Sequence, residues 1–227
     1  MIEFKNVGKK YSGGSFGLEK VTFSVVPGEF VYLIGKSGAG KTTILKLLIG
    51  EVKPSSGKII FKGHEIQRFS RGNIARLRRK IRMVFQDFKT LFDRTVLENV
   101  MLSLYILGRR GKEAEAEAKK ALKLVGLEDK YNYFPVQISA GELQRVAIAR
   151  AIAGGPEVLL ADEPTGNLDP ETGGEIITLL EEINRDGTTV IVTTHNAQLV
   201  DKARKRVIAI EEGKIVRDQK EGAYHAS

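Results

Sequence analysis

Residues 35 to 43 have the types and the spacing of a loop that binds phosphate. They are Gly35, Lys36, Ser37, Gly38, Ala39, Gly40, Lys41, Thr42 and Thr43, of which the first eight match the pattern G-x-x-x-x-G-K-[ST]. Glycines let the backbone approach phosphate oxygens closely, so that N–H groups and the N-terminus of a following helix face the anion. Lys41 adds a charge for the β- and γ-phosphates of a nucleotide, and the Thr42 hydroxyl can join the oxygen ligands of Mg2+. The alternative, a glycine-rich turn before a helix, does not account for the lysine and threonine, so the segment predicts a nucleotide site.

Two adjacent carboxylates, Asp162 and Glu163, form a second candidate group. They follow the apolar run 158–161, which predicts a buried strand, and stand at its carboxyl end, where open α/β sheets bind ligands. Asp162 is placed to hold Mg2+ directly or through water, and Glu163 to polarise an attacking water as a general base. A solvated strand end before Pro164 is the alternative, which the phosphate-binding pattern upstream disfavours. The pair predicts nucleotide hydrolysis.

Three single polar residues, Tyr11, Gln86 and His195, stand just beyond the ends of further predicted strands. Each of them, taken alone, is more often an ordinary surface side chain. Their joint placement at comparable strand ends favours a role in the same site.

The segment Ser139, Ala140, Gly141 and Glu142 reads first as a capping box, with serine at the N-cap and glutamate three residues later. It precedes a helix whose apolar face includes Val146. The capping box does not explain Gly141, whose missing Cβ would suit close backbone approach by a phosphate.

Hydrophobic patterning locates the elements that must position these residues. It predicts strands at 2–7, 21–26, 30–34, 58–61, 82–85, 157–161, 189–193 and 207–210. A helix is expected over 41–49, ended by Gly50, and another over 113–125, with acidic residues first, lysines last and Gly126 at its end. The first two strands alternate as half-exposed strands do, which predicts an antiparallel entry layer.

These patterns predict an α/β fold of the P-loop NTPase type, in which a RecA-like core carries an antiparallel β entry layer and an inserted α-helical subdomain. We expect one domain over residues 1–217, with its core in 1–88 and 155–217 and the helical subdomain in 89–154. A polar, frayed tail is expected over 218–227.

Composition limits the classes of protein. The chain has 227 residues, no cysteine and a formal net charge of +8 at pH 7. The lack of cysteine excludes disulfides and thiolate metal sites, and no apolar stretch approaches the length of a membrane span or of a signal-peptide core. We therefore expect a cytosolic protein that reaches a membrane only through a partner. Residues 68–82 hold several arginines and no acidic residue, which suits either an anionic surface or a plain solvated face.

Together these motifs resemble the nucleotide-binding subunits of the ATP-binding cassette (ABC) family, from residue 2 to about residue 217. The resemblance implies that residues 139–144 are the signature segment of the family, although Ala140 and Glu142 depart from its usual Ser-Gly-Gly-Gln. It also implies a role in ATP binding for Ser139, Gly141 and Glu142.

The same resemblance assigns roles to the isolated residues. It implies that Tyr11 stacks on adenine, that Gln86 senses Mg2+ and water, and that His195 contacts the γ-phosphate. Asp169, in the segment 166–169, would lie at the seam of an ATP-dependent homodimer.

Within the family, residues 84–100 are similar to those of the ATPases that act in bacterial cell division, with the segments 87–89 and 93–96 as the distinctive parts. That similarity implies ATP and Mg2+ as cofactors, an integral membrane partner that holds this chain at the cytoplasmic face of the cell membrane, and control of cell-wall hydrolases. It also implies that the segment after Gln86 contacts the partner, with Phe88, Leu91 and Phe92 as the apolar candidates.

The sequence leaves three alternatives to consider, the second of which it disfavours. One is the ATPase of a lipoprotein-release or macrolide exporter, which has the same chemistry but a different membrane subunit. Another is a nucleic-acid maintenance ATPase, which requires a long coiled coil between Lys41 and Asp162 that this chain has no room for. The third is a nucleotide switch that hydrolyses ATP poorly.

Overall fold

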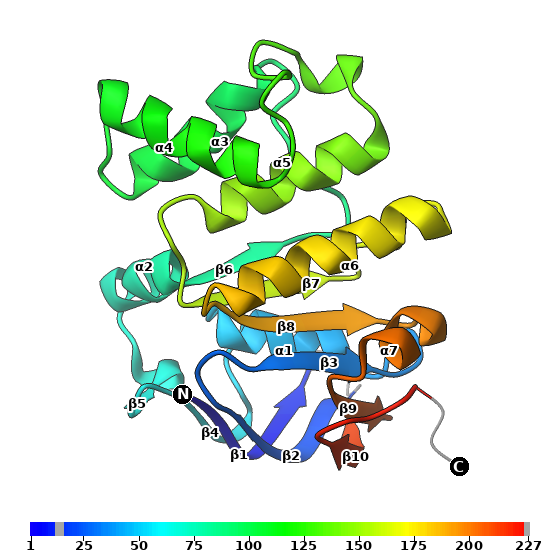
Figure 1. Cartoon of the computed structure of the whole chain (residues 1–227). Coiled ribbons are helices and arrows are strands. Elements are labelled where there is room, and N and C mark those ends of the chain that lie inside the picture. The colour runs from blue at the N-terminus through cyan, green and yellow to red at the C-terminus, as the bar shows by residue number, and fades with distance from the viewer. Residues whose placement is uncertain (12–15, 225–227) are drawn as a thin grey trace.

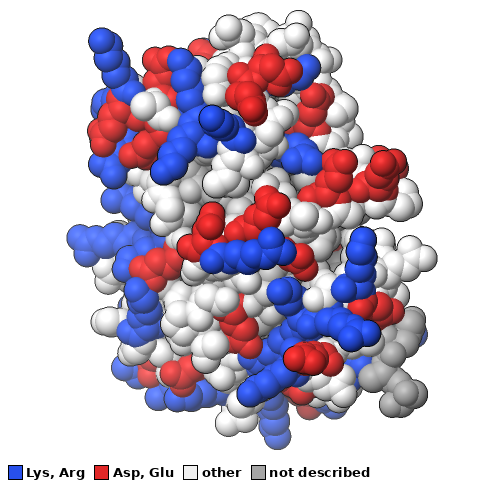
Figure 2. Space-filling view, viewed as in Figure 1, with Lys and Arg blue, Asp and Glu red and all other residues white. Residues whose placement is uncertain are grey.

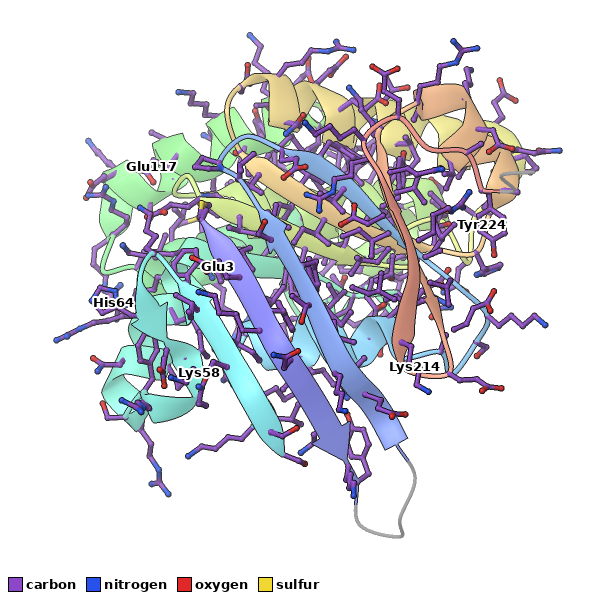
Figure 3. The ribbon with its side chains drawn as sticks, turned by 90° about the horizontal axis from the view of Figure 1, so that it is seen from below. Glu3, Lys58, His64, Glu117, Lys214 and Tyr224 are labelled. Carbon is purple, nitrogen blue, oxygen red and sulfur yellow. The ribbon has the colours of Figure 1, made fainter. Side chains whose placement is uncertain are left out.

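The computed structural model describes residues 1–11 and 16–224, which fold into two β-sheets with helices around them (Figure 1). The smaller sheet has the strand order β2-β1-β4-β5, with β1 Ile2–Lys10, β2 Phe16–Val25, β4 Ser56–Phe61 and β5 His64–Glu65. Its pairings are antiparallel, which confirms the predicted entry layer. Figure 3 shows this sheet from its outer side, on which Glu3 and Lys58 lie.

The larger sheet forms the centre of the molecule. Its order is β10-β9-β3-β8-β7-β6, with β3 Phe30–Ile34, β6 Ile81–Val84, β7 Val158–Asp162, β8 Thr189–Thr194, β9 Arg206–Glu211 and β10 Lys214–Gln219. The strands from β9 to β6 pair in parallel, whereas β10 pairs antiparallel with β9. Parallel strands end together, so the residues after β3, β6, β7 and β8 meet at one edge.

Both faces of this sheet are covered, and alternate residues of β3 serve different cores. Tyr32 packs into a core with helix α6, and Leu33 into another with helix α1 and the antiparallel sheet. The covering helices include α1 Lys41–Leu48, α2 Arg71–Lys80, α6 Pro170–Arg185 and α7 Ala197–Ala203, with a 3-10 turn at Ile66–Arg68. Burial on both faces explains why the sequence of β3 is apolar throughout.

Residues 89–154 contain only helices among their regular elements: α3 Val96–Ile106, α4 Gly111–Leu124, a 3-10 turn at Pro135–Gln137, and α5 Ala140–Ile152. Figure 1 shows α3, α4 and α5 gathered at one end of the molecule. Capping boxes start two of these helices, from Thr95 to Glu98 and from Ser139 to Glu142. None of the helices in the described residues is long and apolar enough to cross a membrane.

The basic stretch 68–82 lies mainly on α2. Figure 2 shows basic side chains that protrude on the side of the molecule where α2 lies. Two of its residues have carboxylate partners, since Arg68 pairs with Glu65 and Lys80 with Glu157. Arg78 donates to main-chain carbonyls at the end of α1.

The expectation of a frayed tail from residue 218 is wrong at its start. Strand β10 continues to Gln219, and Arg217 donates hydrogen bonds to the carbonyls of Ala223 and Tyr224. These contacts return the polar segment to the body of the protein, which its composition could not reveal. Residues 225–227 of the expected tail lie outside the described part of the chain.

Asn99 ties down the segment between β6 and α3. Its side chain is fully buried, accepts a hydrogen bond from the N–H of Leu91, and donates to the carbonyls of Leu91, Arg94 and Thr95. These bonds fix the chain that follows Gln86 onto the first turn of α3.

Replacing Asn99 by alanine is expected to lower the free energy of unfolding by about 2–4 kcal/mol, because it leaves buried main-chain groups without a partner. Urea denaturation measures this loss. The matched control is Asn73→Ala on the exposed face of α2, which should stay within about 0.5 kcal/mol of the parent. A loss below about 1 kcal/mol for Asn99→Ala would show that the bonds do not hold the segment.

Candidate nucleotide-binding site

The phosphate-binding loop joins β3 to α1, as its sequence predicts. Gly40 has a φ of 113°, and a Cβ on it would lie 2.5 Å from the carbonyl oxygen of Gly17. Gly35 is equally constrained, because a Cβ there would meet the carbonyl oxygen of Ile210. Among the residues that the structure describes, no side chain caps the start of α1, so its first N–H groups are available to an anion.

The Lys41 side chain is folded into this loop and is only 6% exposed. Its Nζ donates to the carbonyl oxygens of Gly35, at 2.7 Å, and Lys36, at 3.3 Å. The same Nζ lies 3.4 Å from Oε1 of Glu163. A buried ammonium group needs such partners, and phosphate oxygens would satisfy it in the same way.

Asp162 and Thr42 come together from β7 and α1. Oδ1 of Asp162 accepts hydrogen bonds from the hydroxyls of Thr42, at 3.1 Å, and Thr193, at 2.7 Å. A carboxylate beside a hydroxyl is an oxygen donor set that fits Mg2+, which takes few protein ligands together with phosphate oxygens and waters. Across the described residues, no cluster of three His, Cys, Asp or Glu side chains could hold a metal ion by itself.

Glu163 is held on both sides. Its Oε2 lies 2.6 Å from Nδ1 of His195, while its Oε1 faces Lys41. The residue has a φ of 48°, an unusual conformation for a side chain larger than glycine, and its N–H donates to the Thr193 hydroxyl. This backbone turns the Glu163 side chain toward the phosphate-binding loop.

Most of the predicted residues line one cleft of about 560 Å3 at the carboxyl edge of the sheet. Its lining consists of Lys36, Ser37, Gly38, Gly40, Lys41, Thr42, Thr43, Gln86, Glu163, His195 and Tyr224. Tyr11 lies next to it, because its hydroxyl is 3.2 Å from that of Thr43. Of the predicted strand-end residues, Gln86 and His195 are thus in the cleft and Tyr11 adjoins it.

Ser139, Gly141, Glu142 and Asp169 do not line this cleft. The capping box is confirmed, since the Ser139 hydroxyl accepts from the N–H of Glu142 at 3.2 Å and the Glu142 carboxylate accepts from that of Ser139 at 2.8 Å. Contacts within the chain also explain why residue 141 is a glycine, because a Cβ there would lie 2.5 Å from Cγ2 of Thr172.

Asp169 caps α6 by accepting hydrogen bonds from the N–H groups of Glu171 and Thr172. The hydroxyl of Thr172, followed by its N–H, lowers the pKa of the Asp169 carboxyl below its usual value. Ser139 and Asp169 are the N-caps of α5 and α6. Both helices begin on the side of the molecule toward which the parallel strands point (Figure 1).

The sequence analysis did not identify two residues of the cleft region, Thr193 and Tyr224. Thr193 is a fully buried polar residue within β8, and a threonine inside an apolar strand is a signal that could have found it. Tyr224 reaches the cleft because its N–H donates to Asp201 and its carbonyl accepts from Arg217. No local pattern in the sequence indicates that Tyr224 lies at the cleft.

Comparisons with known proteins agree with this geometry. A family model described as ABC transporter matches residues 18–166. The cell division ATP-binding protein FtsE of Streptococcus pneumoniae strain D39 is 46% identical over 99% of this chain and 97% of its own length. FtsE of Bacillus subtilis strain 168 is 47% identical over 99% and 98%.

A solved structure gives the same result. The dimeric post-hydrolysis state of the ATP-binding cassette MJ0796, bound to ADP and Pi, is similar with a TM-score of 0.88 and 36% identity, over 98% of this chain and 100% of that one. Family model, curated relatives and structure cover nearly the whole chain between them. The chain therefore belongs to the ABC transporter family and, within it, to the group of FtsE cell division ATP-binding proteins.

Proposed function

We propose that this chain is the ATP-binding and ATP-hydrolysing subunit of an ABC complex that acts in cell division. The observation that carries the proposal is the meeting of Lys41, Thr42, Glu163 and His195 at one cleft, in a chain of the FtsE group. Asp162 lies behind them and accepts a hydrogen bond from Thr42. The complex pairs this subunit with an integral membrane subunit similar to FtsX and regulates cell-wall hydrolases.

Nucleotide binding exchanges partners around Lys41. Its ammonium group now bonds main-chain carbonyls and Glu163, and the β- and γ-phosphates of ATP offer stronger, charge-assisted bonds at the same place. The N–H groups of the loop and of the first turn of α1 face the phosphates. Thr42 and Asp162 hold Mg2+, which when bound neutralises phosphate charge. Tyr11, beside Thr43, stacks on the adenine ring.

Hydrolysis then depends on Glu163. Its two oxygens are occupied by Lys41 and His195, so the transfer of Lys41 to the phosphates frees Oε1 to accept a proton from water. His195 keeps the other oxygen in place and is largely exposed, which leaves its ring free to contact the γ-phosphate. Gln86, exposed at the rim of the cleft, positions the same water and Mg2+.

A second copy of the chain completes the site. Ser139, Gly141, Glu142 and Asp169 lie outside the cleft of their own chain, at the starts of α5 and α6. Ser139 and Asp169 are exposed there, whereas Gly141 and Glu142 are half-buried. In an ATP-dependent homodimer they face the nucleotide of the partner, so that each ATP bridges two chains. Loss of the γ-phosphate on hydrolysis then removes contacts that hold the dimer closed.

This chain has a groove to which the membrane subunit can bind. A groove of about 440 Å3 runs between β6 and α3, with Phe85, Leu102 and Ile106 as apolar lining and Arg78, Arg82 and Arg150 as basic lining. An amphipathic cytoplasmic helix of the partner fits such a surface. Leu91 and Phe92, exposed beyond it, remain candidates for contact, whereas Phe88 is half-buried. Binding there places the chain on the cytoplasmic face of the membrane.

Lys41→Ala is expected to weaken Mg-ATP binding by roughly 100-fold or more, because charge-assisted bonds to the phosphates are lost. Calorimetric titration with Mg-ATP measures the affinity. Lys46→Ala, on the same helix but paired with Glu51 at the surface, is the matched control and should bind as the parent does. Parental affinity in Lys41→Ala would exclude this cleft as the nucleotide site.

Glu163→Gln is expected to bind Mg-ATP normally but to hydrolyse it at least about 100-fold more slowly, since an amide cannot accept the proton of water. The ATP-bound dimer should accumulate. Steady-state phosphate release and light scattering measure both effects, with Glu182→Gln on the exposed face of α6 as control. Unchanged turnover would transfer the role of general base to His195.

Leu102→Ser combined with Ile106→Ser is expected to abolish copurification with the FtsX-like subunit, while the melting temperature and ATP binding change little. The two side chains are 40% and 56% exposed, so their replacement should not disturb the core. Val136→Ser, at a residue 75% exposed and outside the groove, is the control. Normal copurification of the double variant would place the docking surface elsewhere, and copurification with an exporter subunit instead would favour the alternative function.

A further inference from the structure

The groove between β6 and α3 contains a charged side chain without a partner. Arg82 lies on β6 and lines this groove. It stands two residues before Val84, which packs into the core that α3 and α5 share, so both side chains point to that face of the sheet. Nη2 of Arg82 is cut off from solvent and has no hydrogen-bond acceptor among residues 1–11 and 16–224. The guanidinium group is therefore partly buried beside the groove without an anion.

The other basic residues of the groove have acceptors within the chain. Arg78 and Arg150 donate to main-chain carbonyl oxygens. Nζ of Lys89 lies 2.6 Å from Oδ2 of Asp87. Among the groove residues that the structure describes, Arg82 is thus the basic residue that forms neither a hydrogen bond nor an ion pair through its side chain. An anion that enters the groove finds its unpaired counter-charge at this residue.

The described part of the chain supplies no carboxylate to Arg82. Glu51 is the one acidic residue that lines the groove there, and it pairs with Lys46 at 3.2 Å. Burial lowers the pKa of the Arg82 guanidinium, and the like charge of Arg79 lowers it further. A charge that is partly removed from water without a counter-ion reduces the stability of the fold. The chain thus carries a destabilising charge at the surface where the membrane subunit is proposed to bind.

We propose that Arg82 pairs with a carboxylate of the membrane subunit, on the amphipathic helix that enters this groove. The inference rests on the proposed function, which supplies that subunit. A planar guanidinium group and a carboxylate form two parallel hydrogen bonds, which fix the position of the helix as well as bind it. The apolar lining by Phe85, Leu102 and Ile106 requires apolar residues three or four positions from the acidic one, on the same face of that helix.

The apolar side chains of the groove argue against a small anion or a lipid phosphate as the occupant. Leu102 and Ile106 are 40% and 56% exposed, and an anion alone would leave them in contact with water. A helix that brings both a carboxylate and apolar side chains satisfies Arg82 and covers these residues at the same time. The combination of one unpaired charge with exposed apolar groups therefore favours a protein segment.

Arg82→Met tests in the isolated chain whether the charge is unsatisfied. Methionine keeps much of the length of the side chain and removes the charge, so the melting temperature should rise by about 2–4 °C. Arg76→Met, exposed on α2 and outside the groove, is the matched control and should melt as the parent does. A melting temperature of Arg82→Met that does not rise would show that the fold already satisfies this guanidinium, and would overturn the proposal.

The same variant should bind the FtsX-like subunit at least about tenfold more weakly, because the carboxylate of the subunit loses its cation. Biolayer interferometry measures the affinity, with the subunit in nanodiscs of phosphatidylcholine, whose headgroups carry no net charge. Arg76→Met should bind as the parent does. Parental affinity of Arg82→Met would overturn the proposal. So would a loss of affinity that occurs only after phosphatidylglycerol is added, since it would assign Arg82 to lipid phosphate.

An exchange of charges identifies the carboxylate. Arg82→Glu should abolish binding, and each Asp and Glu in the cytoplasmic segments of the FtsX-like subunit is then replaced by Arg in turn. One of these replacements should restore the affinity for Arg82→Glu to within about threefold of the parental pair. A complete absence of rescue would refute the pairing. A parent chain that does not bind the FtsX-like subunit would refute the proposed function, whereas a parent that binds no better than Arg82→Met would refute the pairing alone.

Discussion

The burial of one positive charge, the ammonium group of Lys41, determines how the site is built. With the side chain 6% exposed, the charge is stable only because carbonyl oxygens and Glu163 surround it. Those partners come from the phosphate-binding loop and from the end of β7, which holds the two segments together across the sheet edge. The arrangement is also ready to accept an anion, since phosphate oxygens can replace the carboxylate without leaving the charge unpaired.

The sequence predicts what local geometry dictates. The phosphate-binding loop, the acidic end of β7 and the two sheets follow from glycine spacing, a Lys-Thr pair and apolar periodicity, each a property of neighbouring residues. Gln86 and His195 could be assigned to the cleft because parallel strands end at one edge. These inferences needed only the order of elements along the chain.

The structural features that could not be predicted from the sequence depend on contacts between distant segments. Tyr224 reaches the cleft through Asp201 and Arg217, and β10 extends past Arg217 because it pairs with β9. The contact between Gly141 and Thr172 needs the relative position of two helices, which capping patterns do not specify. A composition-based view of residues 218–224 as a polar tail could not include any of these long-range bonds.

Helix α5 links the three functional regions proposed for the chain. Its first turn carries Ser139 and Gly141 at the exposed end, while Arg150 near its last turn lines the groove between β6 and α3. Arg150 donates to the carbonyls of Phe88 and Lys89, two residues with positive φ just after Gln86. Burial lowers the pKa of this guanidinium, so it depends on those carbonyls for hydrogen bonds. Arg150 therefore joins the segment that follows Gln86 to the groove between β6 and α3, and it does so from the helix whose other end is capped by Ser139.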